Sequence, residues 1–335
     1  MRSREKRESD VSDEIPGTVK LPARAIPLPV TISEEARDFL SNPMFSQELS
    51  VPELTDIEGW RAHAARSNAG LSAMMKMQAA AFEYTYEVRH LNHCELYEVI
   101  PARIDSEDKA MLNIHGGAFI VGGGEAALHA AVKLADQAGV RTFSVDYRMP
   151  PDHPFPAGLD DCVEAYRFML ERYKAECIAI YGGSAGANLV AAMVLKARDQ
   201  GLPIPAACVM HSPVSDLRQV GDSFTTNAEL DVVLKRPADW MPALYSGGHD
   251  LMDPLLSPLF GDFAKGFSPS LFTSGTRDLL LSDTVRLHRA LRAAGVRAEL
   301  HVWEAMCHGM AHNAPEAREI LDEHIGFVRR ELGIG

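Results

Sequence analysis

The feature that most constrains the fold is an alternation of short apolar runs with longer helical segments, which begins near residue 110. The apolar runs predict buried strands at residues 110–114, 141–145, 177–181, 206–210, 271–273 and 298–303. The other segments predict helices at residues 126–138, 159–173, 187–198, 282–294 and 315–332. This alternation is typical of an α/β fold with a mostly parallel central sheet flanked by helices. Two alternating runs, at 84–89 and 95–100, predict an antiparallel pair of strands at the edge of the sheet.

One of these strands runs into a glycine-rich turn that carries a single serine, Gly182-Gly183-Ser184-Ala185-Gly186. A turn of the form G-x-S-x-G takes the chain sharply from a strand into a helix and exposes the serine at its apex. The small residues on both sides let strand and helix approach closely. The helix that follows directs its N-terminal N–H groups toward the serine. Five small residues can also match by chance, so the neighbouring strand ends have to support the motif.

A second glycine turn follows the strand at 110–114, in the sequence His115-Gly116-Gly117-Ala118-Phe119. In a parallel sheet, functional loops lie at the carboxyl ends of the strands. A Gly-Gly turn can be a flexible loop, or it can make backbone N–H groups converge on an oxyanion, which contributes roughly 10²–10³ in rate per donor. Its place upstream of the serine turn favours the second interpretation. The predicted oxyanion donors are the N–H groups of Gly117, Ala118 and Ala185.

An acid and a base follow two later strands. Asp278 lies in the loop after the strand at 271–273, whereas Asp283 lies at the start of a helix, where a carboxylate caps the helix or complements its dipole. His308 follows the strand at 298–303 and completes the order Ser, Asp, His; its competitor His312 lies toward the last helix. The sequence therefore predicts Ser184 as nucleophile, His308 as general base and acid, and Asp278 as the orienting carboxylate.

Over roughly residues 85–330, the chain resembles the bacterial hormone-sensitive-lipase-like (family IV) carboxylesterases of the α/β-hydrolase superfamily. The stretch from Asp146 to Ala157 is similar to the family's Y-R-L-A-P-E-H-P-F-P-A segment, and the loop at 115–119 is similar to its HGGG-type oxyanion loop. There are three departures. Ala118 replaces the third oxyanion glycine, for which we expect little effect. Gly183 stands where members often have Asp or Thr, and the acid loop is one residue longer than D-P-L-x-D.

The resemblance implies a serine esterase that hydrolyses short- to medium-chain carboxylic esters through an acyl-enzyme. It also implies a domain division. Residues 1–80 would form a disordered N-terminus and a first cap segment, and residues 81–335 a catalytic domain with 212–260 inserted as a second cap segment. Large apolar side chains there and beside the oxyanion loop are candidates for the substrate pocket, with mutual packing as the alternative: Phe119, Met77, Phe82 and Trp240, and further Met74, Phe224, Leu234 and Tyr245.

The N-terminal part departs from the alternation. The charged residues 1–14 predict disorder, and the prolines in residues 15–30 predict an extended segment. Ser33, followed by two glutamates, predicts a helix that ends near Pro43. Two further helices are predicted at 56–68 and 74–82.

Composition limits the partners. The chain has 335 residues and a formal net charge of −13, which disfavours nucleic acid and anionic membranes. It contains no apolar run near 18 residues and no secretory h-region at its N-terminus. Five scattered cysteines without ligand spacing predict reduced thiols, a cytoplasmic location, and no metal or other cofactor. The expected partner is a small-molecule ester. Because members of this family often dimerise, strand 297–303 or the next helix is where a homodimer contact is expected.

Two alternatives remain open. The same residues could act on a lactone or on an acetyl ester of a specific small molecule, while an amide is a less favourable substrate because its leaving group is poorer. In the other alternative, the chain is a non-catalytic small-molecule receptor on a hydrolase scaffold. Receptors of that kind have typically lost a member of the triad, usually the histidine, so the presence of His308 favours an enzyme.

Overall fold

The computed structural model describes residues 18–19, 22–41, 51–234, 239–309 and 313–335. The predicted disorder of residues 1–14 and the predicted helix end at Pro43 lie outside this part of the chain. Within it, the strands form one eight-stranded sheet in the order β1-β2-β4-β3-β5-β6-β7-β8. The strands are β1 (Tyr84–His90), β2 (Glu95–Pro101), β3 (Ala110–Ile114), β4 (Arg141–Asp146), β5 (Ile178–Gly183), β6 (Ala207–His211), β7 (Ser270–Gly275) and β8 (Ala298–Trp303).

The pairing confirms a mostly parallel sheet with an antiparallel edge. β2 runs antiparallel to β1 and to β4, and all the other neighbours are parallel. In this register Ile114 lies opposite Gly182, and Gly183 lies opposite His211. The strands β3, β5 and β6 therefore end at the same height, and the loops that follow them meet at the carboxyl edge of the sheet.

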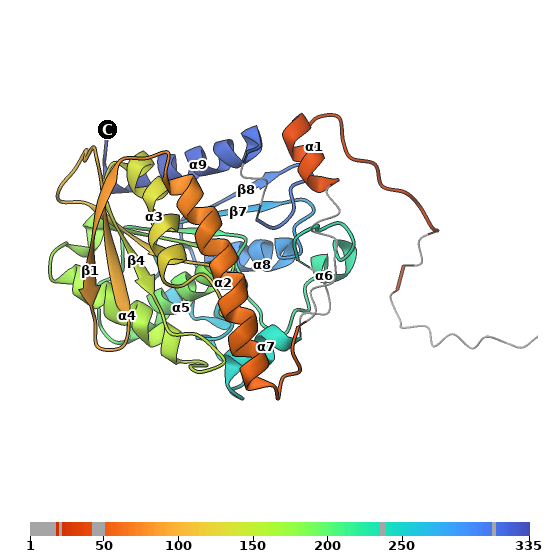
Figure 1. Ribbon diagram of the computed structural model, residues 1–335, viewed down its shortest axis with the longest axis horizontal. Coiled ribbons are helices and arrows are strands. Elements are labelled where there is room, and N and C mark those ends of the chain that lie inside the picture. Colours follow the sequence, from red (N-terminus) through yellow and green to blue (C-terminus); the bar gives the residue numbers. More distant parts are fainter. Residues whose placement is uncertain (1–17, 20–21, 42–50, 235–238, 310–312) are drawn as a thin grey trace, which may run out of the picture.

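Helices cover both faces of the sheet (Figure 1). They are α1 (Glu34–Leu40), α2 (Ile57–Ala79), α3 (Glu125–Ala138), α4 (Ala157–Leu170), α5 (Ala185–Asp199), α6 (Ser223–Thr226), α7 (Trp240–Ser246), α8 (Leu281–Ala293) and α9 (Pro315–Leu332). Residues of α4, α5 and α8 share one core cluster with Leu112 of β3, whereas residues of α3 and α9 share another with Met111. Successive side chains of a strand point to opposite faces, so both faces of β3 are buried.

The N-terminal helices partly differ from the prediction. α1 begins as expected, because the Ser33 hydroxyl accepts a hydrogen bond from the N–H of Ala36. The prediction of two helices at 56–68 and 74–82 was wrong, because α2 is continuous from Ile57 to Ala79. Gly70 lies between the two predicted helices and interrupts the helical pattern of the sequence. Glycine inside a helix lowers helix stability by about 1 kcal/mol relative to alanine. The packing of α2 along α3 outweighs that cost.

Residues 212–267, predicted to be irregular, hold the two short helices α6 and α7 and the 3-10 turns Pro258–Phe260 and Phe263–Lys265. The rings of Trp60 on α2 and Trp240 on α7 are 5.3 Å apart, so the N-terminal helix contacts this inserted segment. Within the described ranges, no helix combines the length and the apolar character that a membrane crossing requires.

Candidate active site

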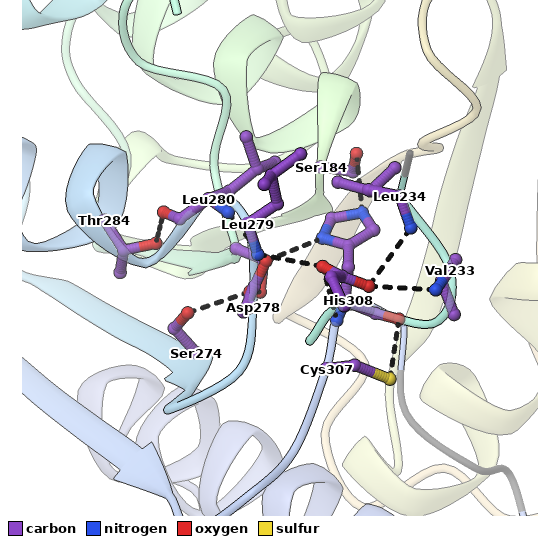
Figure 2. A network of polar contacts seen from close by, with 12 residues as sticks. Ser184, Val233, Leu234, Ser274, Asp278, Leu279, Leu280, Thr284, Cys307 and His308 are labelled. Atoms are coloured by element: carbon purple, nitrogen blue, oxygen red, sulfur yellow. Dashed lines mark hydrogen bonds and ion pairs between the residues drawn. The ribbon is translucent and has the colours of Figure 1, made fainter. Parts of the chain in front are cut away.

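The three predicted triad residues meet above the carboxyl edge of the sheet. Nε2 of His308 lies 3.0 Å from Oγ of Ser184, and Nδ1 lies 3.3 Å from Oδ1 of Asp278. Figure 2 shows the imidazole between the hydroxyl and the carboxylate. The three side chains come from the loops that follow β5, β7 and β8. The competitor His312 lies outside the described residues.

The serine turn has the strained geometry that exposes a nucleophile. Ser184 adopts φ 56° and ψ −121°, an unusual backbone conformation for a residue with a side chain. A Cβ on Gly186 would lie 2.0 Å from the carbonyl oxygen of Ile114, so only glycine fits between α5 and β3. A Cβ on Gly183, the unusual position, would meet nothing closer than 3.9 Å. The turn therefore requires glycine at Gly186 but not at Gly183.

Asp278 is fully buried and is held as a carboxylate by its neighbours. Its Oδ2 accepts hydrogen bonds from the hydroxyls of Ser274, at 2.8 Å, and Ser212, and its Oδ1 accepts one from the N–H of Leu280 at 2.8 Å. Burial alone would raise the pKa of Asp278, but the charge and hydrogen bond of His308, together with these donors, lower it to about 2. The charge needed to stabilise an imidazolium is therefore present at neutral pH.

The imidazole of His308 is buried as well. Burial alone would lower its pKa, but the charge of Asp278, the hydrogen bond to Asp278 and the charge of Asp231 together raise the pKa above its ordinary value of 6.5. A base with a raised pKa accepts the serine proton more readily, provided that the pH is high enough for the free imidazole to be neutral.

The second carboxylate, Asp231, was not predicted. Its Oδ2 accepts from the N–H groups of Leu279, at 2.8 Å, and His308, at 3.3 Å, while its Oδ1 accepts from those of Val233 and Leu234 at 2.9 and 3.1 Å. Burial raises the pKa of this carboxyl group. Asp231 thus ties the acid loop and the histidine loop to the inserted segment. Asp231 lies in a stretch without strand or helix periodicity. Because it does not follow a predicted strand, no feature of the sequence placed it at the active site.

Asp283 is the structural carboxylate, as predicted, and it lies in the first turn of α8, where a carboxylate complements the helix dipole. The N-terminus of α8 has no side-chain cap. Instead, Oδ2 of Asp283 accepts from the N–H groups of Ser215 and Asp216 at 2.8 and 3.0 Å, which anchors the start of the inserted segment. Burial raises the pKa of Asp283 to about 7.

The loop after β3 presents free backbone donors. Gly117, Ala118 and Phe119 have φ of 115°, 52° and 64°. Within the described part of the chain, the N–H groups of Gly117 and Ala118 have no hydrogen-bond acceptor. The N–H of Ala185 lies in the first turn of α5, where a helix leaves its N–H groups without intrahelical partners. Alanine in the left-handed region costs about 1–2 kcal/mol, so replacing the third glycine by Ala118 has a conformational cost that the sequence did not predict.

Tyr147 holds this loop in place. Its hydroxyl donates to the carbonyl oxygen of His115 at 2.9 Å, and the two rings stack 4.1 Å apart. A second restraint comes from α2, where the side chain of Asn68 accepts from the N–H of Gly122 at 2.8 Å and donates to the carbonyl oxygen of Gly123 at 3.2 Å. The segment around Tyr147, which carries the family resemblance, therefore helps to position the loop.

A cavity of about 520 Å³ has Ser184 and His308 on its wall. The predicted pocket residue Met74 lines it, together with Leu71 and Met75 from the same helix. The apolar side chains of α2 thus lie close to the nucleophile.

The four residues proposed first for the substrate pocket lie elsewhere, and none is among the described residues that line this cavity. Phe119 is fully buried and stacks on Tyr245 at 3.7 Å, and Trp240 packs against Trp60. Met77 is 72% exposed, and Phe82 packs in a separate core cluster at the end of α2. Among the residues that the structure describes, no group of three or more His, Cys, Asp or Glu side chains could hold a metal ion.

Comparison with known proteins agrees with this geometry. A family model described as the α/β-hydrolase fold matches residues 111–312. An acetyl-hydrolase of Streptomyces hygroscopicus is 35% identical over 255 residues, 74% of this chain and 84% of the relative. The crystal structure of an esterase superposes with a TM-score of 0.84 at 35% identity and covers 93% of this chain and 98% of that one. An esterase of the bacterial hormone-sensitive lipase family superposes with a TM-score of 0.73 at 31% identity, over 85% and 100% of the two chains. The chain therefore belongs to the α/β-hydrolase family, among its hormone-sensitive-lipase-like carboxylesterases.

Proposed function

We propose that this protein hydrolyses short- to medium-chain carboxylic esters with Ser184 as the nucleophile. The observation that carries the proposal is the contact of His308 with the Ser184 hydroxyl on one ring nitrogen and with the Asp278 carboxylate on the other, at 3.0 and 3.3 Å. A buried carboxylate on Nδ1 holds the tautomer whose Nε2 can accept a proton, and it stabilises the imidazolium that forms.

The reaction proceeds in two halves. Oγ of Ser184 attacks the ester carbonyl carbon while its proton passes to Nε2 of His308, and the carbonyl oxygen becomes an oxyanion. The N–H groups of Gly117, Ala118 and Ala185 donate to that oxyanion. The C–O bond to the alcohol then breaks, and His308 returns its proton to the departing alcohol oxygen. A water, deprotonated by His308, then attacks the acyl carbon. Collapse of the second oxyanion breaks the bond to Oγ and releases the acid, while His308 returns the proton to Oγ of Ser184.

The cavity and the segments that cover it limit the size of the substrate. We propose that α1, α2 and residues 212–260 form a cap over the catalytic domain, because the Trp60–Trp240 contact joins the two segments and Asn68 binds the loop beside the oxyanion donors. A cavity of about 520 Å³ accommodates a small ester. The name of the acetyl-hydrolase relative supports a short acyl group. We also expect a cytoplasmic enzyme with reduced thiols and no nucleic acid partner. A homodimer contact is expected at β8 or at the helix that follows it.

A fluorophosphonate probe tests the nucleophile directly. Mass spectrometry of the labelled, digested protein should find one adduct, on Ser184, and the Ser184→Ala variant should remain unlabelled. A folded wild-type protein without an adduct would contradict the proposal and would favour a non-catalytic receptor. Rates on p-nitrophenyl esters from acetate to palmitate, on lactones and on acetylated small molecules then define the acyl preference.

A further inference from the structure

The cavity beside Ser184 continues into a polar recess between α2, α3 and α9. Its wall there includes Gln78 of α2, His129 and Lys133 of α3, and His324 of α9. Tyr181 of β5 also lines the cavity, and it packs in the core cluster that α3 and α9 form on this face of the sheet. An acyl pocket for simple alkyl chains would be apolar here, so the polar side chains require an explanation.

Both histidines of the recess have a ring nitrogen without a hydrogen-bond partner. His129 is 7% exposed and His324 is 2% exposed, and Nδ1 of each has no hydrogen-bond partner among the described residues. A buried polar atom without a partner costs about 1–3 kcal/mol. Both nitrogens are covered by neighbouring atoms, and a ligand or ordered water that reached them after a small shift of the rings would recover that free energy.

The protonation of His324 is linked to a neighbouring histidine through one hydroxyl. Oγ1 of Thr273 lies 2.8 Å from Nε2 of His324 and 2.8 Å from Nδ1 of His211. Because a hydroxyl has a single proton, Thr273 donates to one imidazole and accepts from the other. When it donates to His324, the proton of that neutral ring sits on Nδ1. The unused nitrogen is then an N–H donor, as an anion requires.

Lys133 provides the charge. It is half-buried and lies one helical turn from His129 on the same side of α3. It makes no ion pair or hydrogen bond with any described residue, and it is the only Lys or Arg among the described residues that line the cavity. These lining residues include no Asp or Glu, although the chain has a formal net charge of −13. An unpaired cation in a cavity without carboxylates favours an anionic ligand.

We propose that this recess binds a carboxylate carried by the ester substrate, with Lys133 as the ion-pair partner and His129 and His324 as hydrogen-bond donors. The inference rests on the proposed esterase function and narrows it to esters of small molecules that have a second, acidic group. That group can belong to the acyl side, as in a half-ester of a dicarboxylic acid, or to the alcohol side, as in an acylated hydroxy acid.

Paired substrates test the proposal on both sides of the ester. The acyl series compares monoethyl esters of dicarboxylic acids, from glutarate to azelate, with ethyl esters of the monocarboxylic acids of equal length. The alcohol series compares acetylated ω-hydroxy acids with alkyl acetates. In one of the two series the acidic ester should have a kcat/KM about tenfold higher than its neutral partner, the typical effect of a charge-assisted contact. The Lys133→Met variant should lose this ratio.

A matched control distinguishes the loss of a contact in the recess from the loss of one positive charge elsewhere on the protein. Lys76 lies on α2 near the same helices, is 64% exposed and pairs with Glu125 at 3.7 Å. Lys76→Met removes the same charge outside the cavity and should keep the acid-to-neutral ratio. Calorimetry with the Ser184→Ala variant measures binding without turnover, and it should find monoethyl adipate bound about tenfold more tightly than ethyl hexanoate if the acyl side enters the recess. If the alcohol side enters, the same excess should appear for acetylated 6-hydroxyhexanoate over hexyl acetate.

Three results would overturn the recess proposal: no acid preference in either series, a preference that survives Lys133→Met, or equal loss in Lys76→Met and Lys133→Met. Hydrolysis of neutral esters without an acid preference would leave the esterase proposal intact. If neither series is hydrolysed, the esterase proposal fails. Calorimetry then still decides about the recess, since equal affinities for acidic and neutral ligands contradict it.

Discussion

Replacing Asp278 with asparagine should reduce catalysis severely while the fold survives. Asparagine has almost the same shape, can still accept from the N–H of Leu280, and can donate to the Ser212 and Ser274 hydroxyls, which rotate to accept. What it removes is the charge 3.3 Å from Nδ1 of His308. At that distance and an effective dielectric constant of about 20, the attraction for an imidazolium is about 5 kcal/mol. The expected loss in kcat/KM is therefore about 10³–10⁴-fold.

Steady-state kinetics on a p-nitrophenyl ester, measured from about pH 5 to about pH 9, provide the test. Because the charge of Asp278 raises the pKa of His308, the acidic limb of kcat/KM should also move to lower pH in Asp278→Asn. Thermal unfolding establishes that the variant is folded. A loss below about tenfold with an unmoved limb would refute the assignment of Asp278 as the orienting acid.

Asp231→Asn is the matched control, because Asp231 is the other buried carboxylate beside His308. Its oxygens accept from backbone N–H groups rather than from the imidazole ring. We expect a loss of only about tenfold in kcat/KM, together with a destabilisation of about 1–3 kcal/mol, since an amide cannot accept on both of its sides. If Asp231→Asn lost as much activity as Asp278→Asn, the roles of the two carboxylates would have to be exchanged.

Three further predictions concern pH and backbone geometry. For the wild type, kcat/KM should rise through a pKa above 6.5 as His308 loses its proton, and an acidic limb below that value would contradict the raised pKa. Gly186→Ala should lower kcat/KM at least about a hundredfold or prevent folding, because its Cβ would meet a carbonyl oxygen at 2.0 Å, whereas Gly183→Ala has room and should remain active. Asp283 has a folded-state pKa of about 7, above the 3.8 of a free carboxyl group. Its contribution to the free energy of unfolding is therefore largest below about pH 4 and is lost as the pH rises to 7. The total loss is about 4 kcal/mol. Denaturant unfolding measures the free energy of unfolding at about pH 5 and pH 8. The decrease between the two pH values should be smaller for Asp283→Asn than for the wild type, and equal decreases would disprove this account.

The fold and the triad were predictable because each depends on local signals. The strands of the parallel sheet are buried on both faces, so they read as continuous apolar runs, as in Ala110–Ile114. A residue just after such a run is placed at the carboxyl edge by the strand itself. Ser184, Asp278 and His308 all satisfy that condition, and the structure brings them into contact.

The supporting residues were not predictable in the same way. Asp231 comes from the irregular inserted segment, and it reaches the triad only because that segment packs against the loops after β7 and β8. Ser212 directly follows β6, and its contact with Asp278 depends on the pairing of β6 with β7. No periodicity marks a residue whose role is to accept hydrogen bonds from loops that lie distant in sequence. Burial and the contact list reveal such residues, and both are properties of the tertiary structure.

The lining of the cavity beside Ser184 depends on how α2 is rotated about its axis. Leu71, Met74, Met75 and Gln78 lie within one stripe of α2 and line the cavity, whereas Met77 points away and is 72% exposed. The composition of this stretch shows a methionine-rich helix, but which side faces the nucleophile is decided by the packing of α2 along α3. This is why Met74 lines the cavity while Met77 lies outside it.

The two parts of the site therefore have different structural origins. Ser184, Asp278 and His308 are held by strand ends. Asp231 braces the loops of Asp278 and His308 with buried hydrogen bonds, and Tyr147 does the same for the oxyanion loop. The recess is instead formed by side chains of α2, α3 and α9. Among the described residues, Lys133 and His129 make no hydrogen bond to a catalytic loop. A change at Lys133 alters the charge offered to the far end of the substrate and leaves the contacts of His308 in place. The recess proposal therefore separates chemistry from substrate choice: the strand ends carry the reaction, and the side chains of α3 and α9 choose the ester.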